Sequence, residues 1–134
     1  CEKIIRKGGV PYIILRFANV YGRGGKGVIT HLLEDKNPVI TSPLHYTRDF
    51  ININCVCRAI VLALNSKVVN ETINISTGIE TMLGELQKKF KSNVMIRKKR
   101  EIRLSCLNNS KAKNILKWKP KIDLEEGLRN YGKL

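Results

Sequence analysis

The chain has 134 residues, of which 25 are Lys or Arg and 11 are Asp or Glu, giving a formal net charge of +14. This length supports one domain with a hydrophobic core and excludes two full-sized ones. The hydrophobic content of 43% is typical of globular proteins, and no apolar run approaches the roughly 20 residues of a membrane-spanning helix.

The first part of the chain predicts a helix end, a buried strand and a second helix. Residues 2–8 have the pattern of a last helical turn, which Gly8 and Gly9 stop. The apolar run YIILRF at 12–17 favours a strand covered on both faces, as in a parallel sheet. The segment GVITHLLED at 27–35 has helical spacing, and PVIT at 38–41 predicts a short strand.

The middle of the chain contains the clearest helical pattern. RDFININ at 48–54 predicts a strand, and Asn54 is expected to cap the helix that follows. That helix has an apolar stripe made of Val56, Ala59, Ile60, Ala63 and Leu64. ETINIS at 71–76 predicts another buried strand, and NVMIR at 93–97 a further one. Between these two, a helix over 81–90 is expected to bury Met82, Leu83, Leu86 and Phe90.

The last part of the chain predicts two short helices. Ser110 can cap a helix that runs to Leu116, and Pro120 disfavours its continuation. Asp123 and Glu126 form an N-terminal capping pattern for a final helix that buries Leu124, Leu128 and Tyr131. Strands that alternate with helices predict an α/β fold, formed by residues 1–134 as a single unit.

The charge predicts an anionic partner without choosing one. Basic residues are densest at 95–103 and 110–121, where a nucleic-acid surface and a solvated basic face explain them equally well. Aromatic residues make up only 6% of the chain, which disfavours stacking on single strands and makes nucleic acid an unlikely partner.

The cysteines and histidines show no metal-binding pattern. Four Cys and two His lack any C-x-x-C pair or zinc spacing, so no metal is expected. Cys55 and Cys57 lie in an apolar stretch and are expected to be buried thiols. Free thiols without a disulfide framework favour a reducing cytoplasm. The opening CEKIIRKGGV places charges where a signal peptide has its apolar core.

A glycine motif follows the first predicted strand. Gly22, Gly24 and Gly27 form a G-x-G-x-x-G, the pattern of a dinucleotide-binding loop. That loop needs a strand directly before the first glycine and an acidic residue about 20 positions on, after the second strand. Residues 18–21 intervene here, and Asp49 begins a strand instead of ending one. The motif therefore favours either a close backbone approach to another ligand or a flexible connection.

Four successive blocks carry a family resemblance: ILRFANVYGRGGKGVI, TRDFININCVCRAIVLAL, ETINISTG, and REIRLSCLNNSKAKNILKWKPKIDLEEGL. In this order and spacing they resemble the carboxyl-terminal half of the extended short-chain dehydrogenases/reductases, the nucleotide-sugar epimerases and dehydratases of the UDP-glucose 4-epimerase type. The resemblance implies part of a Rossmann-type parallel sheet together with the small α/β substrate-binding lobe.

The resemblance also implies binding residues. Asn19 matches an asparagine that hydrogen-bonds the substrate phosphates, and Arg48 an arginine that grips the diphosphate through its planar fork. Lys98 aligns with a second diphosphate arginine, although Arg97 or Arg100 can serve instead. Phe17 takes the place of a residue near the nicotinamide of NAD.

Each assignment has a structural alternative. Asn19 can form an Asx-type turn, Arg48 a salt bridge with Asp49, Lys98 part of a solvated face, and Phe17 an ordinary core position. The sequence also departs from the family, because Asn54 and Cys55 replace an acidic pair.

In the family, NAD is held by an amino-terminal Rossmann domain, and a Tyr-x-x-x-Lys pair carries out catalysis. CEKIIRK resembles the continuation of the helix that holds this pair, so both residues are expected before residue 1. The implied activity is 4-epimerisation of a nucleotide sugar by hydride transfer to NAD and back, with dehydration or reduction as alternatives. A non-enzymatic nucleic-acid-binding module is the competing class. The chain alone is expected to be inactive and to need a complementing amino-terminal polypeptide or self-association.

Overall fold

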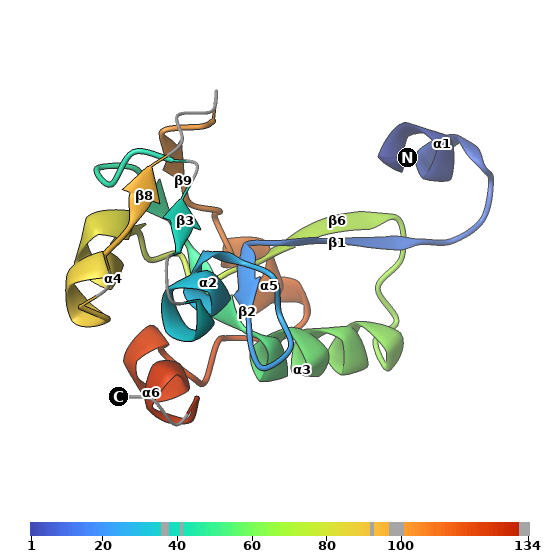
Figure 1. The fold of residues 1–134 in the computed structure, drawn as a ribbon. Coiled ribbons are helices and arrows are strands. Elements are labelled where there is room, and N and C mark those ends of the chain that lie inside the picture. Colours follow the sequence, from blue (N-terminus) through green and yellow to red (C-terminus); the bar gives the residue numbers. More distant parts are fainter. Residues whose placement is uncertain (36–37, 41, 92, 97–100, 132–134) are drawn as a thin grey trace.

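The computed structural model describes residues 1–35, 38–40, 42–91, 93–96 and 101–131. Its longest strand pair joins β1 (Ile13–Phe17) to β6 (Glu71–Ile75) in parallel, with Ile13 opposite Glu71 and Phe17 opposite Ile75. The expected α/β fold with parallel pairing is thus confirmed. Figure 1 shows this pair as a flat ribbon with α1 (Glu2–Lys7) beyond its far end.

The remaining strands of the described residues are short and form three small sheets. β2 (Asn19–Tyr21) pairs in parallel with β5 (Phe50–Asn52), and β3 (Val39–Ile40) in parallel with β8 (Met95–Ile96). β4 (Thr47–Arg48) lies between an antiparallel β7 (Thr81–Met82) and a parallel β9 (Leu104–Ser105).

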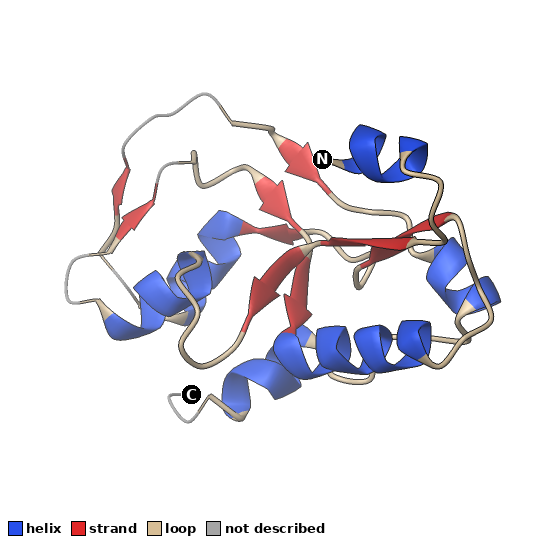
Figure 2. Ribbon diagram, turned by 90° about the vertical axis from the view of Figure 1, so that its right-hand side faces the viewer, coloured by secondary structure: helices blue, strands red, loops and turns tan. Residues whose placement is uncertain are grey.

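Within the described residues five further helices connect or cover these strands, and Figure 2 draws the helices blue and the strands red. They are α2 (Val28–Glu34), α3 (Ile53–Leu64), α4 (Leu83–Lys89), α5 (Ser110–Ile115) and α6 (Leu124–Arg129). The Asp123 side chain accepts a hydrogen bond from the Glu126 N–H at 2.8 Å, so the predicted cap of α6 is confirmed.

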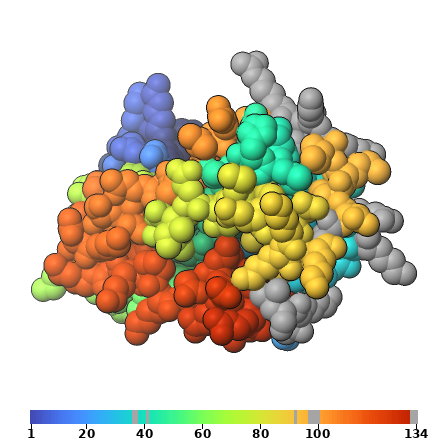
Figure 3. Space-filling view, turned by 90° about the vertical axis from the view of Figure 1, so that its left-hand side faces the viewer, coloured from blue at the N-terminus to red at the C-terminus, as the bar shows by residue number. Residues whose placement is uncertain are grey.

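One hydrophobic core lies between the β1–β6 pair and the helices α3 and α5. Trp118 is fully buried in it and donates its indole N–H to the carbonyl of Cys55 at 3.1 Å. A second core joins α2, α4 and α6 around Phe50 and Leu86. In Figure 3 the side chains of α4 (yellow) and α6 (red) lie directly against each other, which closes this second core on one side.

Several local expectations were wrong. Asn52, not Asn54, caps α3, and its side chain accepts from the Asn54 N–H at 2.9 Å. Asn52 and Asn54 have the same side chain and could each cap the helix. Asn52 is the cap because the strand β5 ends at this residue. Met82 belongs to β7 and is exposed, and Cys57 is exposed although Cys55 is buried. The outer part of the α3 stripe, Ile60 and Leu64, is also exposed.

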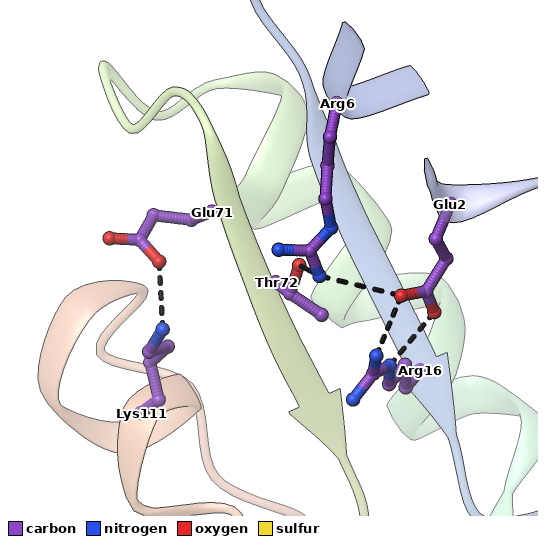
Figure 4. Close-up of polar contacts among 6 residues, drawn as sticks. All are labelled: Glu2, Arg6, Arg16, Glu71, Thr72 and Lys111. Carbon is purple, nitrogen blue, oxygen red and sulfur yellow. Dashed lines mark hydrogen bonds and ion pairs between the residues drawn. The ribbon is translucent and has the colours of Figure 1, made fainter. Parts of the chain in front are cut away.

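Helix α1 is attached to the sheet by a charged cluster (Figure 4). The Glu2 carboxylate accepts two hydrogen bonds from Arg16 of β1, at 2.8 and 2.6 Å. Arg6 donates to the hydroxyl of Thr72 on β6 at 2.8 Å and pairs with Glu2 at 3.4 Å. Because α1 has no buried residue, these polar contacts are what connect it to β1 and β6.

This attachment should be sensitive to acid. The hydrogen bonds from Arg16 hold the pKa of Glu2 at about 2, against a usual 4.5. A carboxylate whose pKa is lowered by folding stabilises the fold fully above its usual pKa, and this contribution is lost as the pH falls through the lowered value. We therefore expect the Glu2 carboxyl to titrate near pH 2 by NMR, with amide exchange of α1 accelerating over the same range.

The variant Glu2→Gln should remove that pH dependence. Glu125→Gln should leave it intact, since Glu125 is an exposed carboxylate on α6. A Glu2 midpoint close to 4.5 would show that α1 is not held by this pair.

Because α6 packs closely against Tyr21 of β2, a side chain at Gly127 should lower the stability of the fold. A Cβ built at Gly127 would overlap the hydroxyl and ring of Tyr21. We expect Gly127→Ala to lower the free energy of unfolding by about 1–3 kcal/mol, despite the better helix propensity of alanine. Gly27→Ala is the matched control in urea denaturation, because a Cβ there meets no atom closer than 3.9 Å. Equal stability of the two variants would contradict the tight packing at Tyr21.

Candidate functional site

Asn19 is positioned by the pairing of β2 with β5. Asn19 lies opposite Phe50 in the parallel register, and Phe50 directly follows Asp49 in the chain. Its backbone N–H donates to the Asp49 carbonyl at 2.8 Å, and its side-chain Nδ2 donates to the same oxygen at 3.2 Å. These bonds are made across the sheet, so Asn19 is not the isolated Asx turn that was its structural alternative. Asn19 is exposed, and its amide is held at the start of β2.

Arg48 ends β4 and is largely buried, with 12% of its side chain exposed. Its Nη2 donates to Glu101 Oε2 at 2.9 Å and to Ser42 Oγ at 3.1 Å. Its Nη1 donates to the carbonyls of Thr47 and Ile102, at 2.8 Å each. The ion-pair partner of Arg48 is therefore Glu101 and not the neighbouring Asp49.

Asn19 and Arg48 line one pocket, although they are 29 positions apart in the chain. Its volume of about 290 Å³ is at the lower end of the size of small-molecule sites. Polar and charged groups gather on part of its wall, and apolar side chains form the rest. The other lining residues are Lys26, Val28, His31, Val39, Ile40, Ser42, Leu83 and Glu101. Such a mixture suits a ligand with an anionic part and a flat or apolar part.

The glycine loop after β2 contributes Lys26 to this pocket. The strand β2 does run directly into Gly22, which corrects the first objection to a dinucleotide cradle. However, the next helix, α2, begins only at Val28. The Asp49 carboxylate, the acidic group considered for the ribose, accepts a hydrogen bond from the Gly78 N–H instead. The loop instead packs onto the fold: Gly22 lies against Ile53, and its carbonyl accepts from Tyr131 Oη at 2.8 Å.

Tyr21, the last residue of β2, connects this region to α6. Burial raises its pKa to about 12, so the phenol stays protonated and donates to the Asp123 carbonyl at 3.2 Å.

Asp49 follows Arg48 in the chain and accepts the hydrogen bonds of Asn19 through its carbonyl. It is 1% exposed, and its carboxylate accepts from Thr77 N–H at 3.0 Å, Thr77 Oγ1 at 2.6 Å and Gly78 N–H at 2.9 Å. Burial and this carboxylate raise the pKa of the Cys106 thiol, whose Sγ lies 3.7 Å from Asp49. Asp49 thereby fixes the turn after β6 to the junction between β4 and β5.

The other two expected residues are not brought into this pocket. Lys98 lies outside the residues that the structure describes. Phe17, at the end of β1, is 42% exposed and does not line the pocket with Asn19 and Arg48.

The pocket is also lined by Glu101, Ser42 and Lys26, which were not predicted from the sequence. For Glu101 the sequence offered one signal, its position three residues after Lys98, an expected binding residue. For Ser42 and Lys26 the sequence contained no such signal, because their place depends on the packing of the loops before β4 and α2.

The described part of the chain contains neither a membrane-spanning helix nor a metal-binding cluster. No helix there is long and apolar enough to span a membrane. No group of three or more His, Cys, Asp or Glu in those residues could hold a metal ion.

Parallel strands, helices that pack against them and a pocket beside the start of β2 and the end of β4 describe an α/β protein with a candidate small-molecule site. Residues 1–76 match the NAD dependent epimerase/dehydratase family. The chain belongs to this family.

Relatives with known names agree with this assignment. A Methanocaldococcus jannaschii protein with a provisional UDP-glucose 4-epimerase name is 37% identical over 90% of this chain and 44% of its own length. The Thermotoga maritima UDP-glucose 4-epimerase, solved with UDP-glucose, has a TM-score of 0.79 at 33% identity, over 96% of this chain and 47% of its own. The Bacillus cereus UDP-glucuronic acid 4-epimerase, solved with UDP-glucuronic acid and NAD, has a TM-score of 0.79 at 27% identity, over 96% of this chain and 46% of its own. The chain thus spans about half the length of the relatives that it matches.

Proposed function

We propose that this chain forms the nucleotide-sugar side of the active site in an NAD-dependent 4-epimerase that acts on a UDP-hexose. The observation that carries the proposal is that Asn19 and Arg48, from separate strands, line a single pocket. An amide and a guanidinium are the donors that suit the oxygens of a diphosphate. The apolar wall formed by Val39, Ile40 and Leu83 suits a flat base.

NAD would accept a hydride from the sugar and return it. Since the glycine loop of this chain packs against Ile53 and Tyr131, we propose that the NAD pyrophosphate and the Tyr-x-x-x-Lys pair belong to a preceding, amino-terminal half. Phe17, exposed at the end of β1, is the proposed contact to the nicotinamide side, and Lys98 a further diphosphate contact. In this account the 134 residues alone bind the nucleotide sugar without converting it. A 4,6-dehydratase or a reductase would use the same binding half.

Titration of UDP-glucose and of a poly-U oligomer at two salt concentrations tests this proposal. Each phosphate contact of a single-stranded oligomer releases counterions, so its affinity should fall with a log–log slope of about 0.7 per contact. Binding at one diphosphate should depend far less on salt. Saturable UDP-glucose binding with a shallow slope supports the proposal, whereas tight, steeply salt-dependent oligomer binding without a UDP-glucose response would replace it by a nucleic-acid-binding module.

A further inference from the structure

A histidine, His31 of α2, lines the same pocket as Asn19 and Arg48. Its side chain is 45% exposed, so a ligand in the pocket can reach the ring. The Nδ1 atom of His31 lies 2.8 Å from Oδ2 of Asp35, one helical turn further along the chain. A hydrogen bond at one ring nitrogen fixes the orientation of an imidazole and leaves the other nitrogen for a ligand.

The contact with Asp35 also determines which nitrogen carries the hydrogen in a neutral ring. An ionised carboxylate only accepts hydrogen bonds, so Nδ1 of His31 is the donor. In a neutral imidazole the second nitrogen, Nε2, then has a lone pair and no hydrogen. The oxygens of a diphosphate are acceptors as well, so a neutral His31 cannot bond them. After protonation Nε2 becomes a donor, and the ring gains a positive charge.

The charges around His31 favour this protonation once a ligand is bound. Lys26 of the glycine loop, Arg48 of β4 and Glu101 line the pocket with His31, and Asp35 lies on its own helix. These two cations and two carboxylates compensate one another before a ligand enters. The lining side chains that come from β2, β3 and α4 are uncharged. A diphosphate adds negative charge, which stabilises the charged form of a nearby imidazole.

We infer that His31 is a further ligand-binding residue: as an imidazolium held by Asp35, it donates Nε2–H to the diphosphate that Asn19 and Arg48 bind. This inference rests on the proposed function, because it takes the ligand to be a nucleotide sugar in this pocket. Binding then takes up a proton. The contribution of His31 to the affinity is therefore present in full below the titration of the free ring, and it is lost as the pH rises through the titration of the bound ring.

Calorimetric titration of UDP-glucose into the full chain between about pH 5.5 and pH 8 tests the inference. The diphosphate of UDP-glucose is substituted at both ends, so it lacks the second ionisation near pH 6 of a terminal phosphate and keeps its charge over this range. We expect the affinity to be about three- to tenfold higher at the acidic end. His31→Gln should abolish this difference. His45→Gln should retain it, because His45, the other histidine of the chain, is exposed and does not line the pocket.

NMR of the two histidine rings gives a measurement that a purely structural role of His31 would not change. Saturating UDP-glucose should move the titration midpoint of His31 to higher pH and leave that of His45 in place. Asp35→Asn should flatten the pH dependence of the affinity. An amide can also donate to Nδ1, and a neutral ring then carries its hydrogen on Nε2.

The outcomes separate this inference from the proposed function. If UDP-glucose binds equally well across the pH range, or if His31→Gln keeps the wild-type dependence, His31 does not contact the diphosphate and the inference is wrong. A lower affinity at the acidic end would show that the neutral ring accepts a hydrogen bond from the ligand, which also overturns it. If a cooperatively unfolding chain binds no UDP-glucose at any pH, the proposed function fails and the inference with it.

Discussion

Replacing Arg48 by methionine is expected to reduce the affinity for UDP on the order of 10- to 100-fold. The substitution removes the charged fork that we place on the diphosphate. It also leaves Glu101 in the pocket without the cation that it pairs with at 2.9 Å, so the remaining carboxylate repels the ligand. Calorimetric titration of UDP measures the loss directly.

Three controls make this result specific. Arg48→Lys keeps the charge and should fall between the wild type and methionine, because an ammonium cannot bind two oxygens in one plane. Arg129→Met removes an exposed arginine from α6 and should bind UDP as the wild type does. In a Glu101→Gln background, Arg48→Met should cost less, since the repulsion is gone. If the Arg48→Met variant folds and binds UDP with wild-type affinity, Arg48 is not part of the binding site.

The variant Asp49→Ala is expected to lower the free energy of unfolding by about 3 kcal/mol. The carboxylate is almost fully buried, and it is the acceptor for the backbone N–H groups of both Thr77 and Gly78. Alanine leaves these donors without that partner in a region closed to water, which costs more than the loss of an exposed hydrogen bond. Urea denaturation measures the difference.

Asp123→Ala is the matched control for this prediction. Asp123 also accepts from a backbone N–H, at 2.8 Å, but it is exposed at the start of α6. Loss of such a helix cap costs about 1 kcal/mol. Asp49→Asn, which keeps one side-chain oxygen, should lie between the two. If Asp49→Ala is no more destabilising than Asp123→Ala, the turn after β6 is not held by this carboxylate.

The sequence predicted the fold well where local chemistry decides it. The β1 and β6 strands and the cap of α6 follow from apolar runs and from an aspartate three positions before a glutamate. The errors lie where neighbours in space decide. The start of α3 depends on where β5 ends, and Met82 is drawn into a strand by its antiparallel pairing with Thr47.

The pocket could be predicted only in part. Asn19 and Arg48 were expected from a family resemblance, and they do line one pocket. Glu101 reaches Arg48 across 53 positions of sequence, through the parallel pairing of β4 with β9, and local patterns do not contain such a contact. The exposure of Ile60 and Leu64 on α3 could not be predicted for the same reason. Helical periodicity identifies an apolar stripe, but it does not show which part of the stripe another element covers.

The most direct test of the shared diphosphate site is an NMR titration of the isotope-labelled chain with UDP-glucose. We expect the Asn19 side-chain amide and the Arg48 guanidinium resonances to shift together, to saturate at one ligand concentration, and not to respond to uridine. Shifts confined to the exposed lysines at 111–121, or movement of Asn19 and Arg48 at different ligand concentrations, would contradict it.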